Sequence, residues 1–383
     1  MESPAIVLTT SLGWICAALA GVGVVYTLVA GVLAARFVSR RARPAETFPS
    51  VSVIKPLYGA NPQLAQSLSC FCDQDYPGEL QILFGVQDAR DPAIAVVEAL
   101  KAARPELDIQ LVVDPRLYGA NRKASNLANI ATHARHGLLV LSDADIGVRP
   151  DYLRRVVAAM SAPGVGAVSC LYVGGGRGVW GRLAAMQIDY QFLPNAAMGK
   201  SLGLAQPCFG STIAISAEVL EEIGGFAAFA DHLADDYEIG RAVRARGYRI
   251  AIPPMIVSHH CGEETGAQLF DHEMRWGRTV RQIDPAGYAG SIITYPTPLA
   301  LAAAALFGLA PWSIGLLVAT LASRLLLKVC VDAATGSRAG PWWLLPIRDV
   351  MSFGVFLASF AVNTVGWQGR RFRVGPDGVL LHT

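Results

Sequence analysis

The sequence predicts an α/β domain built on a mixed, mostly parallel sheet, with transmembrane helices on both sides of it. Two observations predict this arrangement. Long apolar segments lie near both ends of the chain, and short apolar runs alternate with helical stretches between them. Of the 383 residues, 52% are hydrophobic and only 16% are charged, whereas about a quarter of the residues of an ordinary soluble domain are charged. The apolar excess is concentrated in the terminal regions, which favours membrane insertion there.

The first apolar segment predicts a membrane anchor. Ala5–Phe37 has no charged residue before Arg36, and a helix needs about 20 apolar residues to cross the hydrocarbon core. A cleaved signal peptide would begin with basic residues, but the charge that precedes this segment is Glu2. Positive residues stay on the cytoplasmic side. The N-terminus should therefore face outward and the middle of the chain the cytoplasm, because four arginines end or follow the segment: Arg36, Arg40, Arg41 and Arg43.

Two further apolar runs, Leu299–Leu327 and Met351–Trp367, leave two topologies open. Three crossings would return the tail to the cytoplasm, where its basic residues belong: Arg370, Arg371 and Arg373. Alternatively, Pro311 splits the first run into a re-entrant hairpin. The hairpin keeps inside three basic residues that three crossings would place outside: Lys328, Arg338 and Arg348.

These segments divide the chain into four expected regions. They are an N-terminal transmembrane anchor (1–37), a cytoplasmic α/β domain with an interfacial C-terminal part (48–296), a membrane region of about two spans or a hairpin plus a span (297–369), and a cytoplasmic tail (370–383). The net charge of +2 gives no basic surface for nucleic acid, so no nucleic-acid partner is expected. Cys70 and Cys72 lack the second cysteine pair that a zinc site needs, which indicates reduced thiols.

The middle region alternates predicted strands and helices. Such alternation is typical of βαβ units, in which ligands bind at the carboxyl ends of the strands. No strand is followed by G-x-G-x-x-G and no Walker-A loop is present, so dinucleotide and P-loop chemistry are disfavoured. The glycines Gly174–Gly176 are expected in a flexible loop. The predicted strands are Val51–Ile54, Leu80–Val86, Ile109–Val113 and Leu138–Leu141, and the predicted helices are Pro62–Phe71, Ala93–Ala103 and Arg122–Ala134.

Acidic residues follow two of these strands. Asp88 follows the second strand, and Asp143 and Asp145 follow the fourth. Two carboxylates in one turn supply the hard oxygen ligands with which Mg²⁺ or Mn²⁺ holds a nucleotide diphosphate. The bound ion offsets charge on the departing diphosphate. The alternative is an ordinary acidic turn, since turns favour aspartate for local reasons.

A second acidic pair, Asp235 and Asp236, opens a predicted helix that runs to about Arg246. Carboxylates at a helix start can simply cap free N–H groups. They can also act as a general base that takes the proton from an attacking hydroxyl. Two adjacent aspartates leave one available for that second role.

Three other sets of residues are candidates for the same site. The helix expected over Gln268–Gln282 carries His272 close to Arg275 and Trp276, which could hold a diphosphate or simply pack. Lys123 and Asn126 lie in the first turns of a helix, where a cation and backbone N–H groups favour phosphate. His259 and His260 are poorly spaced for zinc, but one of them could be an extra ligand of the divalent ion.

In this order and spacing, Asp88, Asp143-Ala144-Asp145, Asp236 and Arg275-Trp276 resemble the "D, D, D, (Q/R)xxRW" signature of the inverting family-2-like glycosyltransferases. Supporting stretches make the chain most similar to the ceramide glucosyltransferase family, and within it to the bacterial hopanoid-biosynthesis-associated branch. The likeness runs from about Val51 to about Tyr295. The supporting stretches are Lys55-Pro56-Leu57, Val86-Gln87-Asp88, Asp91-Pro92-Ala93, Asn121-Arg122-Lys123, Ser125-Asn126-Leu127, Ile223-Gly224-Gly225-Phe226 and Ala234-Asp235-Asp236-Tyr237.

The resemblance implies a GT-A fold, a UDP-sugar donor and inversion at the anomeric carbon. By position, Asp88 would hold the uridine, and Asp143 and Asp145 the diphosphate and its metal. Asp236 would be the catalytic base, with Asp235 beside it, and Arg275 and Trp276 would close on donor and acceptor. One departure is His272, which stands where the family pattern has Gln or Arg.

For the hopanoid-associated branch, the implied donor is UDP-N-acetylglucosamine and the implied acceptor is a hopanoid polyol such as bacteriohopanetetrol, in a bacterial inner membrane. Ceramide or diacylglycerol glucosylation from UDP-glucose is the first alternative. A non-catalytic lipid- or nucleotide-binding protein on a transferase fold is the second. A processive polysaccharide synthase shares the acidic signature, but it would need more membrane crossings to form a channel.

Overall fold

The computed structural model describes residues 4–203, 205–361, 364–367, 370–374 and 379–382. It divides into two compact units, each of which is described by itself. One unit comprises residues 40–173, 203–262 and 373–383, and we call it the sheet unit. The other comprises residues 1–39, 174–202 and 263–372, and we call it the helical unit.

The sheet unit is built on a seven-stranded sheet in the order β3-β2-β1-β4-β8-β6-β9. β1 pairs in parallel with β2 and β4, and β2 with β3, whereas β8 runs antiparallel to both of its neighbours. The expected mixed, mostly parallel sheet is therefore confirmed. The strands are β1 (Val51–Pro56), β2 (Leu80–Val86), β3 (Asp108–Val113), β4 (Leu138–Leu141), β6 (Val165–Ser169), β8 (Ile213–Ser216) and β9 (Arg249–Ala251).

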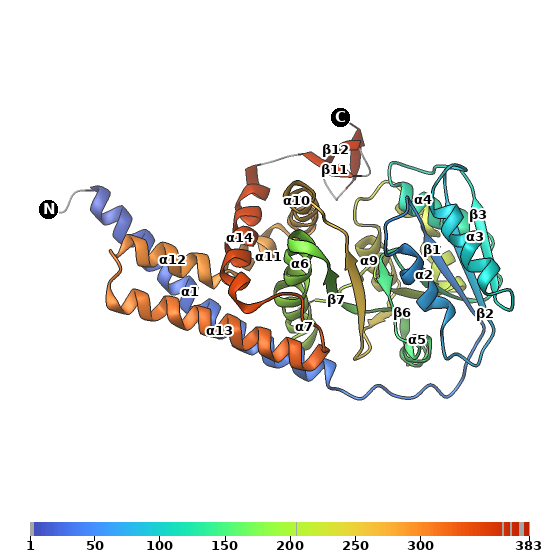
Figure 1. The fold of residues 1–383 in the computed structure, drawn as a ribbon, viewed down its shortest axis with the longest axis horizontal. Helices are drawn as coiled ribbons and strands as arrows, with labels where there is room; N and C mark the ends of the chain where they lie inside the picture. The colour runs from blue at the N-terminus through green and yellow to red at the C-terminus, as the bar shows by residue number, and fades with distance from the viewer. Residues whose placement is uncertain (1–3, 204, 362–363, 368–369, 375–378, 383) are drawn as a thin grey trace. The chain divides into compact units, whose positions relative to one another are not determined.

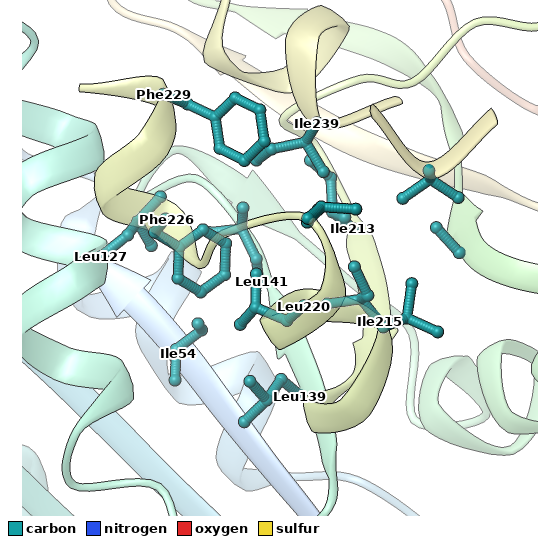
Figure 2. Close-up of a cluster of buried hydrophobic side chains, with 14 of the residues drawn as sticks. Ile54, Leu127, Leu139, Leu141, Ile213, Ile215, Leu220, Phe226, Phe229 and Ile239 are labelled. Atoms are coloured by element: carbon teal, nitrogen blue, oxygen red, sulfur yellow. The ribbon is translucent and has the colours of Figure 1, made fainter. Parts of the chain in front are cut away.

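Helices supply the apolar side chains that cover this sheet. Because side chains alternate between the two faces of a strand, Ile54 of β1, Leu141 of β4 and Ile215 of β8 lie in one buried cluster. Leu127 and Phe226 also pack into this cluster (Figure 2). A second cluster, around Phe84, lies under α2 and α3. The helices of the unit are α2 (Leu64–Cys72), α3 (Ala93–Ala103), α4 (Arg122–Ala131), α5 (Tyr152–Met160), α8 (Ala217–Glu222), the short 3₁₀ turn η2 (Phe226–Phe229) and α9 (Asp235–Ala245).

A small second sheet lies at the carboxyl end of β4. In it, β10 (Ile256–Cys261) lies between β5 (Ile146–Gly147) and β7 (Leu171–Gly176), which begins in this unit. β10 pairs antiparallel with β5 and places His259 opposite Ile146. The histidine-bearing strand therefore runs beside the acidic turn that joins β4 to β5.

In the helical unit, α1 (Pro4–Val38) packs along α12 (Pro296–Leu306) and α13 (Pro311–Thr335), and the three helices lie side by side in Figure 1. The indoles of Trp14 and Trp312 stack 4.9 Å apart near one end. Toward the other end, the Cβ position of Gly31 is 3.4 Å from the backbone of Leu327. α1 and α13 therefore run parallel to each other, and α12 runs against both.

Buried ion pairs join three helices of the helical unit. Arg324 of α13 binds Asp349 of α14 (Leu345–Ala361), and the adjacent Arg348 binds Glu273 of α10 (Gly266–Ile283). The other elements are α6 (Gly178–Gln187), the π-helix η1 (Ile188–Phe192), α7 (Leu193–Ser201), α11 (Pro285–Gly290), the 3₁₀ turns η3 (Ser291–Thr294) and η4 (Trp342–Leu344), and the strand β11 (Thr364–Trp367). The strand β12 (Arg370–Val374) begins in this unit and ends in the sheet unit, to which β13 (Leu380–His382) belongs.

Three described helices are long and apolar enough to cross a membrane: Ile6–Val38, Pro311–Thr335 and Trp342–Ala361. A further pair, Pro285–Thr294 and Pro296–Leu306, passes the same test only as a broken span bent by 65°. Apolar helices near both ends are therefore confirmed. The expected apolar run to Trp367 does not stay helical, because α14 ends at Ala361 and residues 364–367 are extended. Residues 375–378 and 383 of the expected tail lie outside the described residues.

The prediction of a flexible glycine loop was wrong. Gly174 and Gly176 belong to β7, and α6 follows almost at once. A Cβ on Gly174 would lie 2.5 Å from the Cα of Ala185, and one on Gly176 would overlap the carbonyl of Gly181. These glycines are therefore required by close approach of the strand to α6, rather than by mobility.

Candidate active site

A buried lysine supports the acidic turn that follows β4. Lys55 is fully buried, and its Nζ donates to the carbonyl of Asp143 at 2.7 Å. Burial lowers the pKa of Lys55 to about 8, while the Cys70 thiol and then Asp143 and Asp145 oppose the shift. Ser142 adds a hydrogen bond from its hydroxyl to the carbonyl of Ser211, 3.0 Å away. The turn is thus held in place by β1 and by the segment before β8.

Lys123 joins the two acidic pairs. It lies in the first turn of α4, which Asn121 caps by accepting from the Ala124 N–H. Its Nζ is 2.6 Å from Oδ1 of Asp143 and 3.4 Å from Oδ2 of Asp235. Burial alone would lower the pKa of Lys123, but the surrounding carboxylates outweigh it and raise the pKa. The lysine is therefore a fixed cation among carboxylates, and its contact with phosphate stays a prediction.

Asp236 lies in the first turn of α9, where its carboxylate accepts two backbone hydrogen bonds. Oδ2 accepts from the N–H of Gly210 at 2.9 Å, and Oδ1 accepts from the N–H of Tyr237 at 2.8 Å. Burial and then the neighbouring Asp235 raise the pKa of Asp236 to about 6, although Lys123 pulls it down. A carboxylate that titrates close to neutrality is suited to accept a proton during a reaction.

Gly210 is a member of this cluster that the sequence did not single out. Besides binding Asp236, its carbonyl accepts from the N–H of Asp143 at 3.2 Å. A Cβ at this position would lie 2.7 Å from Oδ2 of Asp143 and 2.9 Å from Nζ of Lys123. The site therefore has no room for a side chain here.

His259 lies beside the second carboxylate of the turn. Its Nε2 is 3.3 Å from Oδ2 of Asp145, and its ring lies 5.7 Å from that of the buried Tyr172. Burial would lower the pKa of His259, but the charge of Asp145 and a hydrogen bond to it raise the pKa well above its usual value. His260 contributes its backbone, whose N–H donates to the carbonyl of Asp145 at 2.8 Å. The side chain of His259 thus contacts the turn.

The chemistry of these donors fits a divalent cation that also binds phosphate. Across the described residues, no three His, Cys, Asp or Glu side chains are gathered in a way that could hold a metal ion alone. Mg²⁺ and its relatives commonly take only one or two protein carboxylates and complete their coordination with substrate phosphate and water. Asp143 and Asp145, with the imidazole of His259 next to them, match that requirement.

Two predicted donor-binding residues have other partners in the structure. Asp88 is largely exposed and pairs with Arg90, whose side-chain hydrogen bond lowers the pKa of the carboxyl. Asn126 is buried, and its Nδ2 donates to the carbonyl of Gly85 at 2.8 Å. Asn126 therefore supports the end of β2, and contact of either residue with a donor stays a prediction.

The predicted Arg275 and Trp276 lie on α10 of the helical unit, together with His272. The ring of His272 meets that of Trp276 edge to face, with centroids 4.5 Å apart. Its Nδ1 is 2.5 Å from Oε1 of Glu263. The structure thus gathers the predicted residues into two groups, one in each unit: Lys123, Asp143, Asp145, Asp235 and Asp236 in the sheet unit, and His272, Arg275 and Trp276 in the helical unit.

The sheet order and the acidic turn define a GT-A type glycosyltransferase fold. A mannosyltransferase from Pyrobaculum calidifontis has this fold, with a TM-score of 0.54 and 23% identity over 91% of this chain and 99% of that one. Residues 15–380 match the model of glycosyl transferase family 21, and the chain belongs to that family. This membership confirms the expected class of enzyme, a glycosyltransferase, and the resemblance to the ceramide glucosyltransferases.

Two curated relatives extend the comparison. Ceramide glucosyltransferase 1 of Caenorhabditis elegans is 27% identical over 238 residues, which cover 62% of this chain and 51% of that protein. An N-acetylglucosaminyltransferase of Rhizobium meliloti is 23% identical over 355 residues, 89% of this chain and 78% of that protein. The chain thus spans about half the length of this and another ceramide glucosyltransferase of Caenorhabditis elegans.

Proposed function

We propose that the protein transfers a sugar from a UDP-sugar to a hydroxyl of a membrane lipid by a single displacement that inverts the anomeric carbon. The observation that carries this proposal is Asp236, whose pKa is raised to about 6 beside a lysine-bridged acidic cluster. No covalent nucleophile is needed for such a displacement, only a base, an aligned hydroxyl and a stabilised leaving group.

In the proposed reaction, the lipid hydroxyl oxygen attacks the anomeric carbon while its proton moves to the carboxylate of Asp236. The bond between the anomeric carbon and the diphosphate oxygen breaks, and UDP leaves with that electron pair. The backbone N–H groups of Gly210 and Tyr237 hold the carboxylate in place. The ammonium of Lys123 lies between Asp143 and Asp235, where it can balance phosphate charge.

Asp143 and Asp145 would hold Mg²⁺ or Mn²⁺, which when bound offsets the charge that grows on the departing diphosphate. The Pyrobaculum mannosyltransferase is described in complex with GDP-Man and Mn²⁺, and we propose an equivalent pairing of nucleotide sugar and cation here. His259 lies close enough to Asp145 to orient it or to join it as a ligand. Asp88 is proposed to bind the uridine, with Asn126 supporting the strand end beside it.

For the donor and acceptor, we propose N-acetylglucosamine from UDP-N-acetylglucosamine and a hopanoid polyol. Similarity to the Rhizobium N-acetylglucosaminyltransferase over most of both chains supports the sugar. A second candidate is glucosylation of ceramide or diacylglycerol from UDP-glucose, which the similarity to ceramide glucosyltransferases favours. Both candidates place the acceptor in the bilayer, which we propose is a bacterial inner membrane.

We also propose that α1 crosses the membrane and that α12 and α13 form a hairpin that enters and returns on the cytoplasmic side. α12 has 11 residues and is therefore about 16 Å long, too short to cross a core of about 30 Å. Because α1 and α13 run parallel, the end of α13 lies on the same side as the arginines that follow α1. Arg338 then stays inside, as the positive-inside rule requires.

The function is tested with membranes that contain the wild type, Asp236→Asn or the exposed control Glu221→Gln. Each is incubated with Mg²⁺ or Mn²⁺ and with UDP-N-acetylglucosamine or UDP-glucose, and lipid extracts are read by mass spectrometry against added bacteriohopanetetrol, ceramide and diacylglycerol. N-acetylhexosamine on the hopanoid with wild type and control, but not with Asp236→Asn, is expected. Hexose on ceramide or diacylglycerol would select the second candidate. UDP-sugar binding with no product from any pair would contradict an enzymatic function.

A further inference from the structure

We propose that Glu263 positions His272, and through it Trp276, for the transfer reaction, so that a Glu–His pair carries out the role that Gln or Arg has in the resembling pattern. The inference rests on the proposed function and adds one positioning residue to it. Glu263 lies just before α10, outside the acidic signature, and the spacing of the motif residues does not point to it.

The first observation is the pairing itself. Nδ1 of His272 lies 2.5 Å from Oε1 of Glu263, and the side chains are 24% and 8% exposed. A carboxylate that binds one ring nitrogen fixes both the tautomer and the plane of an imidazole. His272 is thus oriented by Glu263, with Nδ1 engaged and Nε2 as the nitrogen left to meet a ligand.

The second observation is that the segment bearing Glu263 is itself fixed. Thr265 caps α10 by accepting from the N–H of Gln268, and the side chain of Gln268 accepts from the N–H groups of Glu264 and Thr265 at 2.8 and 3.1 Å. Such a capping box holds the chain entering a helix in one geometry. The capped turn therefore holds the carboxylate of Glu263 in position beside His272.

The third observation links the pair to the motif tryptophan. His272 and Trp276 are four residues apart on α10, and their rings meet edge to face at 4.5 Å with an interplanar angle of 73°. Residues at this spacing are neighbours on a helix surface. Rotation of the imidazole would remove the surface against which the indole packs, so Glu263 controls the orientation of Trp276 as well.

The chemistry indicates what this group meets. An imidazole whose Nδ1 is bound to a carboxylate presents Nε2 in a fixed direction, and in the imidazolium form this nitrogen donates a hydrogen bond. The diphosphate of a nucleotide sugar offers acceptor oxygens for it. A Gln or Arg side chain donates to such oxygens without any partner, because its amide or guanidinium always carries hydrogens. The histidine needs Glu263 for this, whereas the residues in the resembling pattern do not.

The test is a double-mutant cycle on the full-length protein in its membrane. The variants are Glu263→Gln, His272→Gln and the two combined, with Glu264→Gln as the matched control, since Glu264 is the exposed neighbour of the same type. For each, kcat and KM are measured for the UDP-sugar and for the lipid, with thermal stability alongside. Glu263→Gln should lower kcat about 10- to 100-fold, as outer partners of catalytic groups typically do, with KM for the lipid unchanged.

In the His272→Gln background, Glu263→Gln should have little further effect, because glutamine no longer depends on the carboxylate. Equal losses from Glu263→Gln in both backgrounds, or an equal loss from Glu264→Gln, would overturn the inference. If Glu263→Gln does not fold, a stable and active double variant still supports it, and an inactive folded one contradicts it. An inactive wild type would instead count against the proposed function, so the two failures are distinguishable.

Discussion

Arg324 and Asp349 form a buried ion pair that joins α13 to α14. Nη2 of Arg324 lies 2.7 Å from Oδ1 of Asp349, and each side chain is 5% exposed. Asp349 also accepts from the hydroxyl of Thr297 at the start of α12. The next residue back, Arg348, binds Glu273 of α10. Of these two adjacent charged residues on α14, Asp349 therefore binds α12 and α13. Arg348 binds α10, the helix that carries Arg275 and Trp276.

Removal of one partner of this pair should be costly. Asp349→Ala leaves the guanidinium of Arg324 buried without its carboxylate, and such changes cost about 3–5 kcal/mol of stability. The control is Glu98→Ala, which breaks an exposed pair with Lys101 and should cost less than about 1 kcal/mol. Thermal unfolding in detergent measures both. An Asp349→Ala protein as stable as the control would contradict a structural role for the pair.

The pH dependence of transfer should report Asp236. A base must be ionised to accept a proton, and the pKa of this carboxyl is raised to about 6. Activity should therefore be full above that pH and fall about tenfold per pH unit below it. Initial rates of sugar transfer between pH 4.5 and 8 measure this limb. Rates that fall little down to pH 4.5 would contradict this prediction, because a base with the ordinary aspartate pKa of about 3.9 stays mostly ionised there.

Gly210→Ala should strongly reduce activity without a large loss of stability. The new methyl group would meet the carboxylate of Asp143 and the ammonium of Lys123 and displace both. Misplacement of about 1 Å at a reacting centre can cost about 100-fold in rate. Gly137→Ala is the control, because its Cβ would meet nothing within 4 Å. Comparable activity of the two variants would show that the cluster tolerates the shift.

Chelation and readdition of metal should distinguish the two aspartates of the turn from their neighbours. EDTA should abolish transfer, and Mg²⁺ or Mn²⁺ should restore it. Asp145→Asn should raise the cation concentration needed for half-maximal rate, because one hard oxygen ligand is weakened. Titration of rate against metal, with Asp88→Asn as a variant outside the turn, measures the difference. Unchanged activity in EDTA would remove the cation from the proposal.

Cysteine labelling should locate the end of α13. Arg338→Cys and Arg41→Cys introduce thiols at exposed positions after α13 and α1. A membrane-impermeant maleimide should label both in inside-out vesicles and neither in intact cells, if the hairpin returns to the cytoplasmic side. The wild type, whose described cysteines are buried or half-buried, sets the background. Labelling of Arg338→Cys in intact cells would favour three full crossings.

The sequence predicted most of the parallel half of the sheet and part of the site. β2, β4 and α3 have the expected bounds, because apolar runs and helical periodicity are local signals. β8 was missed because a short strand that inserts antiparallel between β4 and β6 depends on contacts far apart in sequence. Gly210 resembles any loop glycine until the structure places Asp143 and Lys123 around it. Lys55 is recognisable in the sequence as a charged residue within a buried strand. Its partner, the carbonyl of Asp143, could be identified only from the fold.

The interleaving of the two units has a consequence for synthesis of the protein. The helical unit needs residues 1–39 and also residues 263–372, so α1 is made long before α13. At about 5–20 residues per second, α1 waits on the order of tens of seconds for its partner. During that time, we expect lipid to cover the face of α1 against which α13 later packs. Translation without a bilayer should therefore yield a sheet unit that can assemble and a helical unit prone to aggregation.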